Sequence, residues 1–284
     1  MKAQTVKVHQ PPSAAWRQRA CVALLWLATG AAAQAADYVA VPGGTLDSVL
    51  ANDADKDPVV VAPFFMRSTP VTQGEFSAFV SASPSWARGS IARTFADAGY
   101  LSDWTTPQAP AAGPNSPQPV VNVSWFAAQA FCEAEGARLP SWLEWEYTAA
   151  ADATRRDARR DPAWRARILN WYERPASSAI PSVGGQANVY GIRDLHGLIW
   201  EWVDDFNALL VSPDSRSRDD PDKLQFCGAG AISLQQRENY AVLMRIALLS
   251  SLSASDSTSS LGFRCVRPQA LSSTGNITNK DSKP

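Results

Sequence analysis

The sequence predicts an α+β domain that is poor in regular secondary structure. Three observations support this fold class: short β-type runs, three helices with recognisable starts, and long stretches rich in proline, alanine and serine. The chain has 284 residues and is 45% hydrophobic, so it is long enough to bury a sizeable core. We therefore expect a few helices and short strands connected by long ordered loops.

Residues 1–35 have the features of a secretory signal peptide. No acidic residue precedes Asp37, and an apolar run of signal length covers residues 21–33. Ala33-Gln34-Ala35 then supplies a small-x-small cleavage pattern. The apolar run is short for a membrane span, so we expect no transmembrane span after cleavage. Retention as an N-terminal anchor is the alternative. The mature protein is expected to be periplasmic or secreted.

The composition excludes two classes of function. Residues 1–35 hold four of the 26 basic residues and none of the 27 acidic ones, so the mature net charge is 22 minus 27, or −5. No basic cluster is visible, which argues against a nucleic-acid partner. His196 is the only histidine after the leader, since His9 lies within it. A multi-histidine metal site therefore cannot be built from one chain.

The predicted strands are short. Residues 38–41 form one apolar run before the turn at Pro42-Gly43-Gly44, and residues 63–67 form a second. Residues 198–206 alternate in the manner of a longer strand. Residues 84–119 are expected to be mostly irregular, anchored by Trp104. Residues 155–167 are charged and expected at the surface, and residues 268–284 are polar and expected to be a disordered tail.

Three helices are predicted from their capping residues. A helix begins near residue 72, a second begins after Ser124 and ends at Gly136, and a third runs from residue 141 to about residue 151. The first and third carry capping boxes, formed by Thr72 with Glu75 and by Ser141 with Glu144.

Five segments, in order along the chain, resemble the formylglycine-generating enzyme (sulfatase-modifying factor) family. They are Pro63-Phe64-Phe65 with Pro70-Val71-Thr72-Gln73; Pro119-Val120-Val121-Asn122-Val123-Ser124-Trp125; Arg138-Leu139-Pro140-Ser141-Trp142-Leu143-Glu144-Trp145-Glu146-Tyr147; Asn188 to Trp202; and Leu261-Gly262-Phe263-Arg264-Cys265. The resemblance implies one domain over residues 36–267. It also implies the family's fold, an α+β arrangement related to C-type lectins.

The family's chemistry depends on a pair of cysteines upstream of the G-F-R motif, which bind copper and oxidise a sulfatase cysteine to formylglycine. Here residues 228–264 contain no cysteine. Counting back from Gly262 places the pair at Gln236 and Ala241, and counting forward from Cys227 places it near Leu234 and Asn239. The resemblance therefore implies a member that lacks the catalytic cysteine pair, and we expect no copper–cysteine mechanism.

The resemblance also implies a disulfide between Cys132 and Cys265. Cys227 is then the odd thiol, which is either a buried, inert cysteine or a reactive or metal-binding one. Together with Met244 and His196, Cys227 supplies the soft donors of a candidate copper(I) or groove site.

Calcium is a second metal that the resemblance implies. One family site uses the asparagine of G-N-V-W-E and its glutamate, and here Leu198 replaces the asparagine while Glu201 remains. The other site begins near Asn170, where few acids follow. We expect at most one calcium site. The alternative is that Glu201 pairs with a core arginine.

Three arginines, Arg138, Arg245 and Arg264, are expected to be structural and to hold carbonyls or carboxylates. The apolar run over residues 240–252 indicates burial or a partner surface where the family has its active groove.

These observations favour a non-catalytic, exported binding or maturation module with a protein or peptide partner. The alternatives are an oxidoreductase that uses the family groove with different chemistry, and a copper-handling accessory protein that uses Cys227 and Met244. No cofactor is expected with certainty; calcium and copper are the candidates. Whether any enzymatic activity remains is left open by the sequence.

Overall fold

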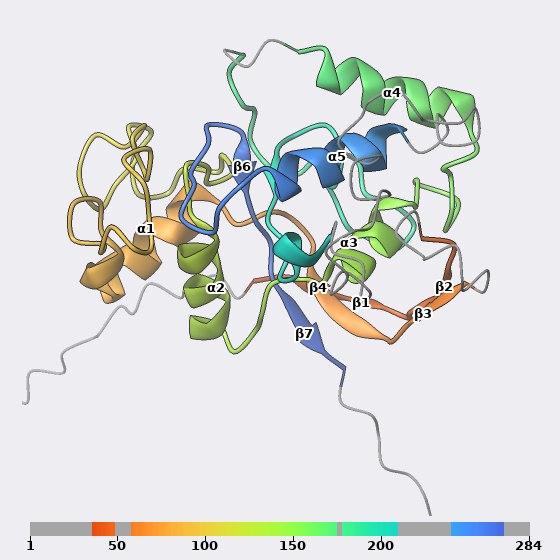
Figure 1. Cartoon of the computed structure of the whole chain (residues 1–284), viewed down its shortest axis with the longest axis horizontal. Coiled ribbons are helices and arrows are strands. Elements are labelled where there is room, and N and C mark those ends of the chain that lie inside the picture. Colours follow the sequence, from red (N-terminus) through yellow and green to blue (C-terminus); the bar gives the residue numbers. More distant parts are fainter. Residues whose placement is uncertain (1–35, 49–57, 175–177, 210–239, 270–284) are drawn as a thin grey trace, which may run out of the picture. The chain divides into compact units, whose positions relative to one another are not determined.

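The computed structural model describes residues 36–48, 58–174, 178–209 and 240–269 (Figure 1). The predicted signal peptide, Cys227 and the tail from residue 270 onward lie outside the described residues. In the described part, no helix is long and apolar enough to cross a membrane.

The strands are short, as the sequence predicts, and they form three small sheets. β1 (Tyr38–Val41), β4 (Phe64–Arg67) and β7 (Val266–Pro268) form an antiparallel sheet in the order β1-β4-β7 (Figure 1). Met66 lies opposite Val39 on one side and Val266 on the other. The first and last strands of the domain are therefore joined through β4. The last strand reaches Pro268, one residue beyond the predicted domain end.

The other two sheets have two strands each. β2 (Gly44–Leu46) pairs with β3 (Val59–Val61) in an antiparallel manner, and β5 (Trp200–Glu201) pairs with β6 (Leu261–Gly262) in parallel. Gly262 is required at this crossing, because a Cβ there would lie 2.1 Å from the carbonyl oxygen of Val120.

The three predicted helices are present with the predicted caps. α1 covers Gln73–Ala82, α2 covers Trp125–Ala134 and α3 covers Trp142–Ala149. Both capping boxes form: Glu75 and Glu144 each accept the backbone N–H of the cap residue at 2.8 Å. Gly136 follows α2 with a φ of 66°, the left-handed conformation that commonly ends a helix.

Two further α-helices and two short 3₁₀ turns complete the described elements. α4 covers Pro162–Tyr172 and α5 covers Tyr240–Ser250, and the two helices pack beside each other (Figure 1). The 3₁₀ turns, η1 (Pro84–Trp86) and η2 (Phe206–Ala208), lie within long loops. The loop over residues 84–119 has little other regular structure, and Trp104 is buried within it.

One prediction from the sequence was wrong, and a second was only partly right. The alternating run 198–206 is a strand only at residues 200–201, because Asp204 N–H donates to the carbonyl of Pro140 and the chain turns toward α3. The charged run 155–167 is only partly at the surface. Asp161 caps α4, and the helix buries Trp164 and Ile168 against Ala158.

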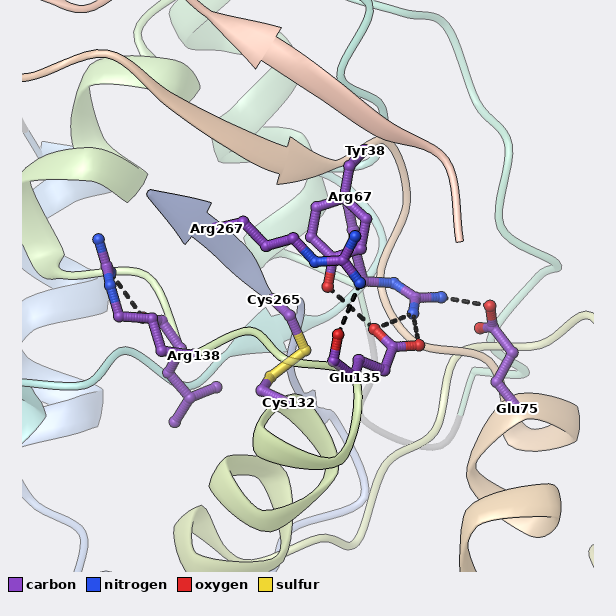
Figure 2. The surroundings of a disulfide bond; sticks show 9 residues. Tyr38, Arg67, Glu75, Cys132, Glu135, Arg138, Cys265 and Arg267 are labelled. Atoms are coloured by element: carbon purple, nitrogen blue, oxygen red, sulfur yellow. Dashed lines mark hydrogen bonds and ion pairs between the residues drawn. A yellow bond between two sulfur atoms is a disulfide. The ribbon is translucent and has the colours of Figure 1, made fainter. Parts of the chain in front are cut away.

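A disulfide joins Cys132 of α2 to Cys265, just before β7 (Figure 2). This is the pair that the family resemblance implies. Beside it, Arg67 binds Glu75 and Glu135, with 2.6 Å between Arg67 Nη1 and Glu135 Oε1. The bond and this ion-pair network tie helices α1 and α2 to the three-stranded sheet.

Candidate functional site

Residues from three of the five motifs meet in a closed polar cluster inside the domain. Glu201, at the end of β5, accepts hydrogen bonds from Arg264 Nε at 2.8 Å and Nη2 at 2.7 Å. Its Oε2 also accepts the indole N–H of Trp145 at 2.9 Å. Glu201 and Arg264 are both completely buried. Burial of an ion pair is tolerated only when its polar atoms are satisfied, as they are here.

Arg245 closes the same cluster from α5. Its guanidinium lies 3.5 Å from the centre of the Trp145 ring, and its Nη2 donates to the backbone carbonyl of Glu201. Burial lowers the pKa of Arg245 to about 10, so the side chain stays charged at neutral pH. The favourable cation–π geometry offsets part of the cost of burying that charge.

His196 stands at the edge of this cluster. The edge-to-face contacts with Trp145 and Trp164 both have ring centres 5.4 Å apart. Burial and the charge of Arg245 lower the pKa of His196 to about 3, so the imidazole is neutral at physiological pH. Its Nε2 lies 3.2 Å from the carbonyl oxygen of Ala149, which can only accept. Nε2 therefore carries the proton and is not free to bind a metal.

The remaining predicted arginine, Arg138, binds both oxygens of Glu144 at 2.6 and 2.7 Å and also donates to the carbonyl of Leu139. All three predicted arginines thus hold carboxylates or carbonyls. Arg264 adds the carbonyl oxygens of Arg67 and Arg193.

Of the predicted copper donors, Cys227 lies outside the described residues, and the two described ones, Met244 and His196, have no contact with each other among the described interactions. Met244 is 38% exposed on α5, whereas its neighbour Arg245 points inward. Among the described contacts, none joins Met244 to His196.

Asn170 is exposed on α4, while both Glu201 oxygens are held by Arg264. This donor arrangement does not fit calcium at Glu201, because a calcium ion would have to compete with the buried guanidinium for the same oxygens. The geometry corresponds to the alternative, a core ion pair.

An open cleft lies beside the buried cluster. It has a volume of about 510 Å³ and is bounded by α4, residues 149–153 and the loop over residues 181–198. His196 belongs to its wall, as do Trp164, Trp171 and Leu198. Of the residues that the sequence singled out as groove or metal candidates, His196 alone lines this cleft in the described part of the chain.

Among the described residues, two arginines of the cleft wall lack a side-chain partner, whereas the acids of the wall have one. Asp194 accepts the backbone N–H groups of Gly184 and Gly185 at 2.7 and 2.9 Å. Arg155 lowers the pKa of Asp152 by hydrogen bonding to its carboxylate. Within the described residues, the exposed Arg167 and Arg174 have no hydrogen bond or ion pair from their side chains. The cleft wall therefore holds two carboxylates that are already hydrogen-bonded and two exposed guanidiniums whose donors are unused among the described residues.

Sequence reasoning missed this cleft because it treated residues 155–167 as a surface run. The signal was present: Asp161 followed by Pro162 marks a helix start, and Trp164, Ile168 and Trp171 recur at helical spacing. The position of the loop of residues 181–198 opposite α4 could not be predicted from local patterns, because it depends on tertiary packing.

Comparison with known proteins agrees with the motifs. The family model described as the sulfatase-modifying factor enzyme 1-like domain matches residues 27–269. The formylglycine-generating enzyme of Streptomyces coelicolor is 31% identical over 174 residues, which cover 55% of this chain and 54% of that enzyme. The hercynine oxygenase of Mycolicibacterium smegmatis is 31% identical over 99 residues, which cover 30% of this chain and 21% of that protein. The chain thus spans about half the length of the Streptomyces coelicolor enzyme and about a fifth of the length of the Mycolicibacterium smegmatis protein.

Among solved structures, PvdO from Pseudomonas aeruginosa is similar with a TM-score of 0.45 and 18% identity, covering 82% of this chain and 94% of that one. The family model covers most of the chain, and the five motifs lie within the matched residues. The chain belongs to the sulfatase-modifying factor enzyme 1-like domain family.

Proposed function

We propose that this chain is an exported, non-catalytic member of its family that serves as a binding or maturation module for a protein or peptide partner. The observation that carries the proposal is the closed cluster around Glu201. Its carboxylate, the guanidinium of Arg264 and the indole of Trp145 bind one another and are buried. Groups bound to one another inside the core in this way stabilise the fold, and their bonded atoms are not available to a substrate.

The cysteine inventory supports the absence of the family's copper chemistry. The sequence has four cysteines, at positions 21, 132, 227 and 265. Cys132 and Cys265 form the disulfide, and Cys21 lies in the predicted signal peptide. Cys227 is then the one remaining thiol of the mature chain, and a two-thiolate copper site needs two.

Two observations support export. The first 35 residues have the charge, apolar run and cleavage pattern of a signal peptide. The disulfide between Cys132 and Cys265 is the kind of bond that persists in oxidising compartments outside the cytosol.

Export is tested by expressing the full chain with its own leader in a bacterial host and separating the periplasm from cytoplasm and membrane. We expect the protein in the periplasm or medium, with an intact mass that shows removal of residues 1–35. Full-length mass in the membrane fraction would support the retained anchor, and full-length mass in the cytoplasm would contradict export.

The non-catalytic role is tested on the same exported protein. It is incubated with copper(I), oxygen and a cysteine-containing sulfatase peptide, and the peptide is analysed by mass spectrometry for formylglycine. The Streptomyces coelicolor enzyme serves as the positive control. We expect no aldehyde and no stoichiometric copper after purification. Aldehyde formation that is lost in Cys227→Ser would overturn the proposal, and copper bound in a Cys227-dependent manner would favour the copper-handling alternative.

A further inference from the structure

We propose that the cleft between α4 and residues 181–198 binds an anionic ligand with an apolar body, of the size of a short peptide segment. This inference rests on the proposed binding role, and it names the site and the ligand chemistry. Among the described residues, the cleft wall includes His196 but not the Glu201, Arg264, Arg245 or Trp145 of the closed cluster.

Two exposed guanidiniums in the cleft wall favour an anion. The carboxylates of Asp152 and Asp194 are already bound by Arg155 and by two backbone N–H groups. Arg167 and Arg174 line the same cleft, are exposed, and lack a partner among the described residues. A guanidinium presents several donors in a planar fork that matches a carboxylate. The two arginines thus supply the positive charge and donors that an anionic ligand needs.

The body of the ligand is expected to be apolar. The cleft wall is mixed, with polar side chains and backbone groups beside an apolar part. The apolar part comes from α4 and the opposite loop, where Trp171 is half-buried and the others are buried: Trp164, Ile168, Leu195 and Leu198. A wall of this kind offers a ligand both apolar contact and hydrogen-bonding groups. The volume of about 510 Å³ lies within the range typical of small-molecule and short-peptide sites.

The wall opposite α4 is held in place by hydrogen bonds, so the cleft is preformed. Asn188 accepts the backbone N–H groups of Tyr190 and Ile192 at 3.0 Å each, and its amide donates to the carbonyl of Thr148. Gly185 and Asp194 approach closely, since a Cβ at Gly185 would lie 2.5 Å from Asp194 Oδ1. A fixed wall lowers the entropic cost of binding a ligand.

The test uses anilinonaphthalene sulfonate, a fluorescent anion with an apolar aromatic body, titrated into the mature exported protein. N-phenylnaphthylamine has a similar apolar body without the sulfonate. We expect one sulfonate probe per chain and weaker binding of the neutral probe. Arg167→Gln and Arg174→Gln should each weaken sulfonate binding by about three- to tenfold, a range set by the partial screening of exposed charges.

The matched control is Arg160→Gln, which removes the same charge from an exposed residue outside the cleft wall. It should leave probe affinity unchanged, and Arg167→Lys should retain most of it. Circular dichroism of each variant checks that the fold is kept. Equal binding of the neutral probe, or equal losses in Arg160→Gln and Arg167→Gln, would overturn the assignment.

The source of the natural ligand is distinguished by competition. An acetylated peptide amide of sequence Glu-Phe-Glu-Leu and free phenylbutyrate both carry a carboxylate and an apolar group. Displacement of the probe by the peptide supports a protein segment as ligand, and displacement by phenylbutyrate alone supports a free organic acid. If neither displaces it, the inference fails. Such a failure leaves the proposed function intact, which is decided separately by the formylglycine and export experiments.

Discussion

Arg264 and Glu201, which are 63 positions apart in the sequence, form a two-point ion pair in which both side chains are completely buried. Each residue belongs to a different family motif. The indole N–H of Trp145, from a third motif, completes the hydrogen bonding of the same carboxylate. Three motifs that resemble a catalytic family thus meet in a structural contact. The following changes test the interactions that hold the domain together.

Glu201→Gln should strongly destabilise the domain, because it leaves the buried charge of Arg264 without its counter-ion. We expect a loss of about 3–5 kcal/mol in the free energy of unfolding, measured by urea denaturation. Glu133→Gln, on the exposed face of α2, should change it by less than about 0.5 kcal/mol. The paired change Glu201→Leu with Arg264→Met should cost less than the sum of the two single changes. A small effect of Glu201→Gln would show that the pair is not a major support of the fold.

The disulfide should contribute substantially because it closes a long loop. Cys132 and Cys265 are 133 positions apart. Replacing both by alanine should lower the free energy of unfolding by about 2–5 kcal/mol. Cys227→Ala serves as the comparison, since it leaves the bond intact. Wild-type protein unfolded in the presence of reductant should approach the double variant, and an unchanged midpoint in reductant would contradict the prediction.

The N-cap of α3 offers a smaller and more local test. Ser141 Oγ accepts the N–H of Glu144, and Glu144 accepts the N–H of Ser141 in return. Ser141→Ala removes one acceptor from the helix start and should cost about 1 kcal/mol, while Ser141→Gly should cost only a few tenths. Ser90→Ala, at an exposed loop position, is the control. Equal effects at both serines would indicate that the cap does not stabilise α3.

His196 should make the domain less stable in mild acid. Burial and the nearby Arg245 lower its pKa to about 3 in the folded chain, against an ordinary value of 6.5. Between these values the unfolded chain binds a proton that the folded chain does not. The free energy of unfolding therefore falls as the pH drops below about 6.5, by up to about 1.4 kcal/mol per pH unit, and does not depend on this titration at higher pH.

The measurement compares wild type with His196→Gln by urea denaturation at about pH 7.5 and about pH 5. Glutamine does not titrate, so the His196→Gln variant lacks this acid sensitivity. The other titrating groups contribute equally to the pH dependence of both proteins, so their contributions cancel in the comparison. The stability advantage of wild type over the variant should shrink at the lower pH. The same difference at both pH values would show that His196 does not titrate abnormally.

The sequence by itself determined the elements whose signals lie within a few residues. The strand at residues 38–41, both capping boxes and the end of α2 at Gly136 were readable because a cap or an alternating strand depends on near neighbours. The motifs were also sufficient to indicate the family, which the match over residues 27–269 then showed.

Only the tertiary structure decided how those elements are used. The alternating run at residues 198–206 is cut to two strand residues because its backbone finds a partner near α3. The pairing of Glu201 with Arg264 depends on a contact between residues 63 positions apart, and the α4 cleft depends on how neighbouring segments pack against one another. Such contacts are set by packing and by the need to satisfy buried charges, which local patterns do not encode.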